Sequence, residues 1–248
     1  MSPDAYIEMA EMQATHWWFA ARREILRSQI ERLSLPSGAD ILEVGSGTGA
    51  NLALLSRFGN VVALEVAPEA IALAQARCVD SARPVTMRQG RCPEDLGAMS
   101  ERFDLICLFD VLEHIERDAD SLAKLALLLK PNGTLMATLP AYSWMWGPHD
   151  VRLHHKRRYS RRQLSHKCAQ AGLEVSRMSH FNTILFPVAV LGRLLEKVFR
   201  KATVTTTTPP APINTILARL FALERHCLAR MQLPFGLSIL LLANARRA

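Results

Sequence analysis

Short apolar stretches alternate with helical patterns through the first part of the chain. Strands are predicted at 40–44, 61–65, 85–88, 103–109 and 134–139, and helices are predicted at 51–57, 68–78 and 119–129. Alternation at this spacing is typical of a parallel sheet whose two faces are both covered by helices. We therefore expect an α/β fold.

Helical patterns also precede and follow this alternation. A helical lead-in is predicted over 5–33, a helix over 161–171, and two further strands at 173–180 and 237–243. Between those strands, 183–232 holds two helical segments split by 203–212, a run of five threonines, one valine and three prolines with a single alanine. The chain therefore carries a helical insertion between its last two predicted strands.

Composition adds an uneven distribution of charge. The 248 residues suffice for one α/β domain or at most two small ones, and 49% hydrophobic residues exclude a disordered chain. The net charge is +7, with six Lys/Arg against one acid in 149–162 and seven against two in 183–232. Basic patches of this kind bind nucleic acid, anionic lipid or an acidic substrate, and the sign of the charge does not choose among them.

Cysteine usage and the chain start bear on the compartment. The five cysteines are scattered without a CxxC pair, which argues against a disulfide framework or a zinc site and favours a reducing cytoplasm. The first residues lack the features of a signal peptide, and no run of about 18 apolar residues predicts a transmembrane helix. We expect a cytoplasmic protein, with attachment to the inner face of the membrane as an alternative.

A glycine-rich turn follows the first predicted strand. Gly45-Ser46-Gly47-Thr48-Gly49 has the spacing GxGxG, whereas dinucleotide-binding dehydrogenases usually have GxGxxG. Glycines at a turn from strand to helix allow a ligand to approach the backbone. The turn therefore predicts a ligand-binding loop.

Two acids flank this loop. Glu65 ends the second predicted strand, sixteen residues after Gly49, where a carboxylate can accept hydrogen bonds from both ribose hydroxyls of an adenosine. Glu43 lies just before the glycines and suits an ammonium-bearing ligand. Together these residues predict an adenosine-containing ligand.

Four segments carry a resemblance to a known family. They are 41–49 (Ile-Leu-Glu-Val-Gly-Ser-Gly-Thr-Gly), 63–65 (Ala-Leu-Glu), 103–115 with its Asp110-Val-Leu-Glu-His-Ile end, and 159–164 followed by 171–173. Over about 16–182 the chain resembles the class I S-adenosylmethionine-dependent methyltransferases, in particular the ubiquinone-type (methyltransferase type 11/12-like) branch. The resemblance implies a Rossmann-like, seven-stranded, mostly parallel sheet with its last strand reversed.

Domain boundaries follow from this picture. We expect an N-terminal helical lid over 1–35, a cofactor-binding core over 36–182, an amphipathic helical insertion over 183–232 and the last strand of the core within 233–248.

The resemblance also implies the cofactor contacts. The glycine loop would hold the methionine part of S-adenosylmethionine, Glu65 the ribose, and residues near Asp110 the face of methyl transfer. The predicted contacts are Glu43, Gly45, Ser46, Gly47, Gly49, Glu65, Val66, Arg91, Cys92 and Asp110. Family members often place an acid near 90–92 to contact the adenine amine, and here the residue is Arg91. Adenine would instead meet the backbone at 91–92, or Glu94 or Asp95.

Catalytic groups are expected at Asp110-Val-Leu-Glu113-His114. In-line methyl transfer depends mainly on positioning, but an oxygen nucleophile gains from a base or a metal. Asp110, Glu113 and His114 share a face if the segment is helical. The candidate bases are His114, Asp110 and His149. The candidate ligands of Mg²⁺ are Asp110, Glu113 and His114, joined by a histidine at 149, 154 or 155. Alternatively, these side chains cap a helix and line the pocket without metal.

Two further segments have competing interpretations. The basic stretch 149–162, flanked by aromatic residues, is either a wall of the acceptor pocket that recognises phosphate or carboxylate, or a solvated loop. His16-Trp17-Trp18-Phe19 either closes over the cofactor or docks the first helix on the core.

The insertion at 183–232 bears on the acceptor. Its apolar helical faces and net charge of +5 suit a membrane surface or the roof of a pocket for an apolar substrate, and equally packing on its own sheet or on a second subunit. We expect O-methylation of a small hydrophobic or lipid-linked acceptor, with nitrogen or carbon acceptors left open. The alternatives are an RNA methyltransferase using 149–162, or a non-catalytic module that binds S-adenosylmethionine.

Overall fold

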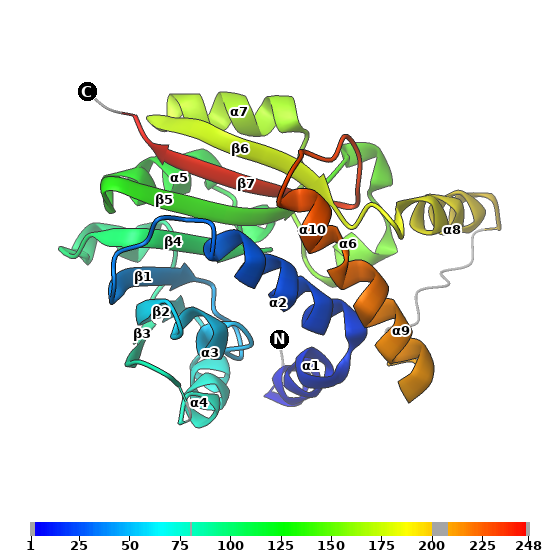
Figure 1. Cartoon of the computed structure of the whole chain (residues 1–248), viewed down its shortest axis with the longest axis horizontal. Helices are drawn as coiled ribbons and strands as arrows, with labels where there is room; N and C mark the ends of the chain where they lie inside the picture. Colours follow the sequence, from blue (N-terminus) through cyan, green and yellow to red (C-terminus); the bar gives the residue numbers. More distant parts are fainter. Residues whose placement is uncertain (1–2, 80, 200–207, 247–248) are drawn as a thin grey trace.

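Seven strands form one sheet in the order β3-β2-β1-β4-β5-β7-β6 in the computed structural model, which describes residues 3–79, 81–199 and 208–246 (Figure 1). The strands are β1 Ala39–Val44, β2 Gly59–Glu65, β3 Val85–Gln89, β4 Phe103–Phe109, β5 Leu129–Pro140, β6 Leu173–Phe181 and β7 Ser238–Ala245. β7 runs antiparallel to both of its neighbours and the other pairs are parallel. The predicted fold, including the reversed last strand, is confirmed.

Apolar residues on both sides of the central strands explain why helices cover both faces. Successive side chains of a strand point to opposite faces, and Ile41 and Leu42 of β1 are both fully buried. Ile41 belongs to a core shared with Ile25 of the N-terminal helices, whereas Leu42 belongs to a second core shared with Leu122. The sheet therefore separates two hydrophobic cores.

The helices between the strands agree largely with the predictions. They are α3 Leu52–Leu55, α4 Pro68–Arg77, α5 Asp118–Leu127 and α7 Arg161–Gln170. Only α3 is much shorter than predicted. Gly59 is already paired with Ala39 of β1, and a Cβ on Gly59 would lie only 1.9 Å from the Ala39 carbonyl oxygen. Because the sheet begins at Gly59, α3 ends before it.

The helical lead-in forms two helices, α1 Pro3–Thr15 and α2 Trp17–Ile30. His16 separates them with an extended backbone, and its Nδ1 accepts a hydrogen bond from the Trp18 N–H at 3.2 Å, which caps α2. α2 packs on the sheet through Ile25 and Leu26. α1 instead crosses at the glycine loop, where Gln13 accepts a 2.7 Å hydrogen bond from the Thr48 hydroxyl.

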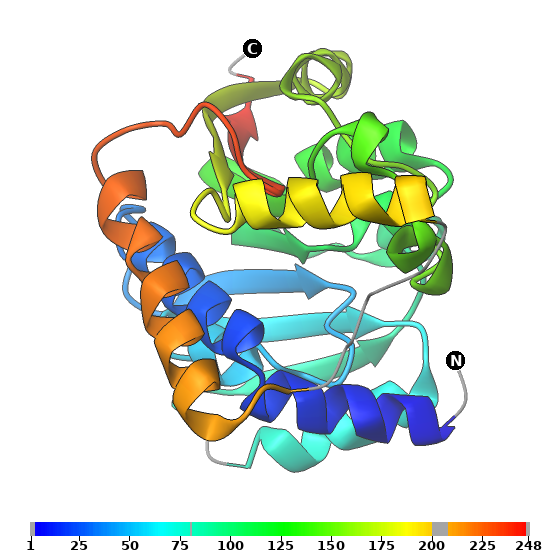
Figure 2. The ribbon, with the colours of Figure 1, turned by 90° about the vertical axis from the view of Figure 1, so that its right-hand side faces the viewer.

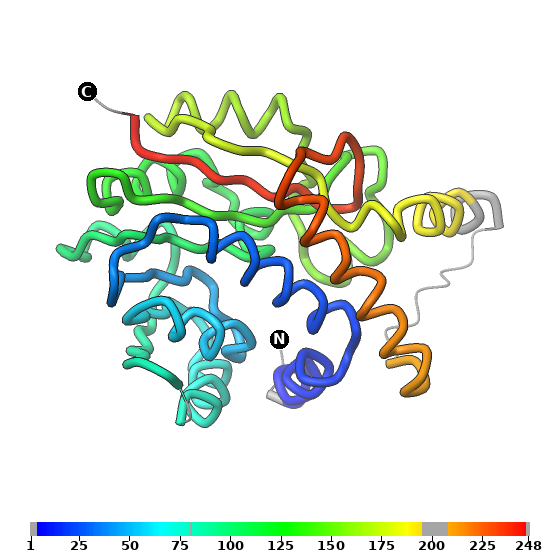
Figure 3. The backbone as a smooth tube through the Cα atoms, in the orientation of Figure 1, coloured from blue at the N-terminus to red at the C-terminus, as the bar shows by residue number. Residues whose placement is uncertain are grey.

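The insertion contains α8 Phe186–Phe199, α9 Ala211–Ala222 and α10 Glu224–Leu228. α9 lies alongside α2, and α8 lies apart from it (Figures 2 and 3). Part of the predicted break, 203–207, lies outside the described residues. Within the described ranges, no helix combines the length and the apolar character needed to cross a membrane.

Short helices that the sequence did not predict complete the fold. They are η1 Glu94–Ala98, η2 Leu112–His114, η3 Ser143–Met145 and α6 Pro148–Arg152. All but η1 follow β4 and β5 directly, so they gather at the carboxyl edge of the parallel strands, where ligands bind in sheets of this kind.

Candidate active site

The glycine loop turns sharply after β1. Gly45, Gly47 and Gly49 have φ values of +69°, +53° and +80°, a region that favours glycine. A Cβ on Gly45 would lie 2.7 Å from the Val111 side chain, and one on Gly49 would lie 2.9 Å from the Ala74 Cβ. The loop therefore needs glycine both for its backbone angles and for its close packing.

Glu65 joins this loop to the start of α4. One of its carboxylate oxygens accepts a 2.8 Å hydrogen bond from the Gly47 N–H, and the other accepts one of 2.8 Å from the Val66 N–H. The carboxylate is thus fixed beside the glycine loop at the carboxyl end of β2. Its position is the one that the sequence predicted for a ribose-binding acid.

A cavity of about 400 Å³ opens beside Glu65. Of the predicted cofactor contacts, those lining it are Gly45, Glu65, Val66, Arg91 and Cys92, whereas Glu43, Ser46, Gly47, Gly49 and Asp110 lie outside its lining. His114 also lines the cavity. His114, which the sequence predicted as a base, therefore faces the same space as Glu65.

Asp95 and Glu94 differ in their access to this cavity. The Asp95 carboxylate accepts a 2.7 Å hydrogen bond from the Arg91 N–H and does not line the cavity. Glu94 does line it. Of the two acids that the sequence offered for adenine, Glu94 is the better placed.

Glu43 is buried behind the loop. Its Oε1 accepts a 2.9 Å hydrogen bond from the Asn51 amide, and its Oε2 has no hydrogen-bond partner. Burial raises the pKa of this carboxyl from 4.5 to about 7, against the opposing effect of Asn51 and Arg22. An unpaired oxygen on a buried acid leaves capacity for one donor from a ligand.

Asp110 follows β4 with a left-handed backbone, φ +56°. Its Oδ2 forms a 2.7 Å ion pair with Arg22 of α2, and its Oδ1 accepts a hydrogen bond from Thr138 at 3.2 Å. Arg22 is itself buried, and its guanidinium lies 4.9 Å from the centre of the Trp18 ring. The ion pair therefore brings the N-terminal helices to the end of β4.

Asp110, Glu113 and His114 do not share a helical face. Asp110 precedes the single turn of η2 and faces Arg22, so the helix on which the shared face depended is not formed. Instead, ligand atoms of Glu113, His114 and His155 all lie within 4.8 Å of one another. His155 takes the position that the prediction gave to Asp110.

The members of this group differ in exposure, since Glu113 is fully buried, His155 is half-buried and His114 is exposed, and the group is connected to a second acid. Both carboxylate oxygens of Glu113 lack a hydrogen-bond partner, and burial holds the pKa of this carboxyl well above its usual range. Burial also lowers the pKa of His114, whose ring meets that of His155 edge-on at 4.8 Å. The Nδ1 of His155 lies 3.0 Å from the fully buried carboxylate of Asp150.

The structure does not bring His149, the third candidate base, into this group. Its Nδ1 lies 3.4 Å from Arg152, and burial lowers its pKa to about 4. Of the three histidines considered as a downstream partner, 149, 154 and 155, only His155 lies with Glu113 and His114.

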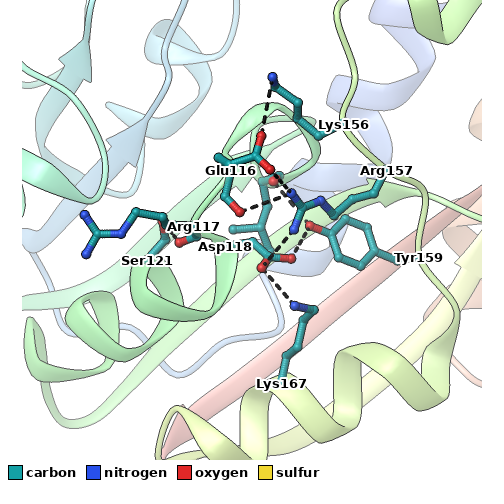
Figure 4. Close-up of polar contacts among 9 residues, drawn as sticks. Glu116, Arg117, Asp118, Ser121, Lys156, Arg157, Tyr159 and Lys167 are labelled. Carbon is teal, nitrogen blue, oxygen red and sulfur yellow. Dashed lines mark hydrogen bonds and ion pairs between the residues drawn. The ribbon is translucent and has the colours of Figure 1, made fainter.

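Three of the six basic side chains of the stretch 149–162 form ion pairs within the protein, namely Lys156, Arg157 and Arg158. Asp118, nearly buried, contacts Arg157 at 3.1 Å and Lys167 at 2.8 Å and accepts a 2.9 Å hydrogen bond from Tyr159 (Figure 4). Arg158 binds Asp150 at 2.7 Å. The stretch is therefore held against η2 and α5 and is not a freely solvated loop.

The two adjacent tryptophans have different surroundings. Trp17 packs edge-on against Phe221 of α9, and its backbone N–H donates a 2.8 Å hydrogen bond to the side-chain oxygen of Asn214. Trp18 lies over Arg22, beside Asp110. One tryptophan thus docks the helix on the insertion, and the other packs on Arg22.

Sequence reasoning missed Arg22 and Asp150. Arg22 belongs to no local motif, since a helical arginine among aromatic residues has no distinctive spacing. Asp150 did leave a signal, because it is the single acid in a stretch with six basic residues. An isolated acid in such a run has a strong electrostatic reason to become their shared partner.

Comparisons with known proteins agree with this geometry. A family model described as a methyltransferase domain matches residues 17–177. A ubiquinone biosynthesis O-methyltransferase of Xanthomonas axonopodis pv. citri is 31% identical over 136 residues, which cover 49% of this chain and 55% of that relative. This chain spans about half the length of the curated relatives it matches.

Two solved structures share the fold. An S-adenosylmethionine-dependent methyltransferase of Clostridium acetobutylicum ATCC 824 is 11% identical with a TM-score of 0.62, and the match covers 98% of this chain and 100% of that one. The glycopeptide N-methyltransferase MtfA, complexed with S-adenosylmethionine, is 14% identical with a TM-score of 0.53, covering 89% and 93%.

Proposed function

This chain belongs to the class I S-adenosylmethionine-dependent methyltransferases, and we propose from that premise that it methylates an oxygen of a small hydrophobic or lipid-linked acceptor. The observation that carries the proposal is the cavity of about 400 Å³ lined by both Glu65 and His114. A carboxylate suited to the ribose and an imidazole suited to the acceptor proton face one space. This is the arrangement that O-methyl transfer needs.

The positions of the described side chains support a role for each of them toward the cofactor. Glu65 receives the ribose hydroxyls, and Val66, Arg91 and Cys92 frame the adenine. The free oxygen of Glu43 accepts a hydrogen bond from the ammonium of the methionine part, and the buried guanidinium of Arg22 attracts its carboxylate.

Methyl transfer then needs a proton acceptor and little else. The sulfonium of S-adenosylmethionine would supply the methyl group to the acceptor oxygen, and His114 would accept the proton that the acceptor hydroxyl loses. The lowered pKa of His114 keeps its ring neutral near pH 7, which is the form that accepts a proton. The ring of His155 packs edge-on against the ring of His114, and Asp150 contacts the Nδ1 of His155. These two residues therefore hold the His114 ring in place.

A metal-assisted route is a second candidate, favoured by one observation. Both oxygens of the buried Glu113 lack partners, and two imidazoles lie within reach, so Glu113, His114 and His155 fit a divalent ion. A bound ion would lower the pKa of the acceptor hydroxyl. Calorimetric titration of the protein with Mg²⁺, Mn²⁺ and Zn²⁺ tests it, and absence of binding by all three would leave His114 alone as the proton acceptor.

The acceptor class rests on the relatives and on the insertion. Relatives at 31–36% identity are named ubiquinone biosynthesis O-methyltransferases. The exposed apolar residues of α8 and α9 support an apolar acceptor and peripheral contact of 183–232 with a membrane. Internal pairing of Arg157 and Arg158 leaves less of the basic stretch for RNA.

One experiment tests the activity. The protein is incubated with S-adenosylmethionine labelled in its methyl group and with fractionated lipid, small-molecule and RNA extracts, beside the Glu65→Ala variant as control. We expect label in a lipid or small-molecule fraction with the wild-type protein only. Label in RNA alone would refute the acceptor class, and cofactor binding without transfer to any fraction would favour the non-catalytic module.

A further inference from the structure

An exposed apolar stripe runs along α9 and ends at Leu223, the residue between α9 and α10. The two helices follow each other through Leu223, whose backbone is itself right-handed helical. Ile213, Ile216, Leu220 and Leu223 are 52%, 57%, 40% and 52% exposed. Their spacing of three and four residues places them on one side of the helix. The opposite side is already used, because Phe221 is buried with the core.

A second exposed stripe runs along α8. Val188, Leu191 and Leu194 are 69%, 58% and 52% exposed and again lie three or four residues apart. The inner side of α8 carries Arg193, which is mostly buried and approaches Asp150 to 3.9 Å. The apolar stripe of α8 therefore lies on the side of the helix away from Arg193 and Asp150.

Both helices border the end of the molecule toward which the parallel strands point (Figure 2). The half-exposed Trp144 adds to this surface, because Tyr142 contacts both Trp144 and Phe186, close to the start of α8. Tryptophan is enriched at membrane interfaces, where its ring meets both apolar chains and water. We call α8, α9, α10 and Trp144 the outer face.

Cations accompany the stripe of α9, and acids are absent from its exposed side. Exposed Arg219 precedes Leu220, and exposed Arg230 lies just past α10. Glu224 is the only acid between 208 and 232. It is buried and accepts backbone hydrogen bonds from Asn182 and Thr183 at 2.6 and 2.7 Å, so it does not offset these charges outwardly.

This charge pattern disfavours a second copy of the chain as the occupant. In an antiparallel pair of α9 helices, like flanks face each other and Arg219 and His226 would meet the same basic row. In a parallel pair, Arg219 and His226 of one helix would face Leu217 and Glu224 of the other. Leu217 carries no charge, and the Glu224 carboxylate already accepts a backbone hydrogen bond within its own chain. An anionic partner satisfies the arginines where a second copy does not.

We propose that the outer face docks on a bilayer that contains anionic lipid, with the apolar stripes in the headgroup boundary and Arg219 and Arg230 on the lipid phosphates. The site then opens toward the membrane, so that the acceptor enters from the lipid phase. The identity of the acceptor in this inference rests on the proposed function. The docking of the outer face on a bilayer does not depend on it.

Co-sedimentation with vesicles tests the docking. Wild-type protein is mixed with vesicles of phosphatidylcholine alone or of an equal mixture with phosphatidylglycerol. We expect binding to the mixed vesicles only. Each cation contributes about fivefold to the partition, so Arg219→Ala weakens it about fivefold, whereas Arg102→Ala, at the opposite edge of the sheet, has no effect. Ile216→Glu abolishes binding, and Leu127→Glu, also on an exposed apolar residue, does not.

Two outcomes would overturn the proposal. One is equal sedimentation of wild type and Ile216→Glu with the mixed vesicles. The other is a dimer, measured by light scattering, that Ile216→Glu dissociates. Binding of S-adenosylhomocysteine is measured on the same samples to confirm that each variant is folded. Vesicle binding without methyl transfer would count against the proposed function and leave the docking intact.

Discussion

Arg22 of α2 and Asp110 at the end of β4 form an ion pair of 2.7 Å. The pair ties the N-terminal helices to the end of the strand that η2 and His114 follow. Its guanidinium has further capacity, since the Nε atom has no hydrogen-bond partner. In the proposed assignment of Arg22 to the cofactor carboxylate, binding depends on a residue outside every motif of the cofactor loop.

Replacing Arg22 with alanine is expected to weaken both folding and cofactor binding. The change leaves the Asp110 carboxylate without its cation, which costs about 3 kcal/mol of unfolding free energy for a pair this buried. We expect the Kd for S-adenosylhomocysteine, measured by calorimetry, to rise at least about tenfold. Arg22→Lys keeps the charge but not the two-pronged geometry and should be intermediate. Wild-type affinity in a folded Arg22→Ala protein would contradict this role.

Glu65→Ala is expected to weaken cofactor binding by about 1.5–3 kcal/mol, because the ribose hydroxyls lose a charged acceptor. Fluorescence or calorimetric titration with S-adenosylhomocysteine measures the loss. Glu69→Ala is the matched control, since Glu69 is exposed on α4, four residues further along the chain. Equal affinities of the two variants would refute the assignment of Glu65.

Glu43 is expected to make stability fall as pH rises. Its pKa is raised from 4.5 to about 7 in the folded protein, so between these values the folded state binds more protons than the unfolded state. The cost of the buried charge is absent below pH 4.5 and fully present above pH 7, where it reaches about 3 kcal/mol. Glu43→Gln should therefore be more stable than wild type at pH 8 and equally stable at pH 4.5.

Urea unfolding at the two pH values measures this difference. A Glu43→Gln protein less stable than wild type at pH 8 would show that the carboxylate is stabilised by contacts beyond Asn51. The same variant should bind S-adenosylhomocysteine more weakly at pH 8, because it cannot carry the charge that attracts the ammonium.

His114 and His149 are expected to differ sharply in their effect on catalysis. His114 lines the cavity and meets His155, whereas His149 lies near Arg152 outside that group. His114→Gln should lower kcat by about 100-fold with little change in cofactor affinity, and His149→Gln should leave kcat near wild type. A larger loss in His149→Gln would move the proton acceptor to that residue.

Local patterns sufficed to predict most of the fold. The strands are apolar runs bounded by turn residues, so β4 was predicted with the bounds that the structure has. β5 begins five residues earlier than predicted, because Leu129 pairs with Phe103 before the Lys-Pro-Asn-Gly segment that looked like a turn. The break at His16 was hidden because the helical pattern is similar on both sides of it.

The site was less predictable where it depends on contacts distant in sequence. Glu65 and the glycines follow from strand ends and backbone requirements, which are local. Asp110 could not be separated from Glu113 and His114 by sequence, because its left-handed backbone and its pairing with Arg22 arise only when α2 packs on the sheet. The position of His155 was likewise hidden in the sequence. Its ring lies against His114, and its Nδ1 contacts Asp150, which also pairs with Arg158.

The Glu224 carboxylate closes the insertion at its base. Glu224 belongs to α10, and its carboxylate accepts hydrogen bonds from the backbone N–H groups just after β6. It therefore ties the last helix of the insertion to the start of the insertion. The segment from Leu185 to Leu223 has further anchors, because Phe221 packs in the core and Asn214 accepts a hydrogen bond from the Trp17 backbone N–H. An exchange of this segment against that of a homologue, made to change the acceptor, therefore has to keep Phe221 and Asn214 as well as Glu224.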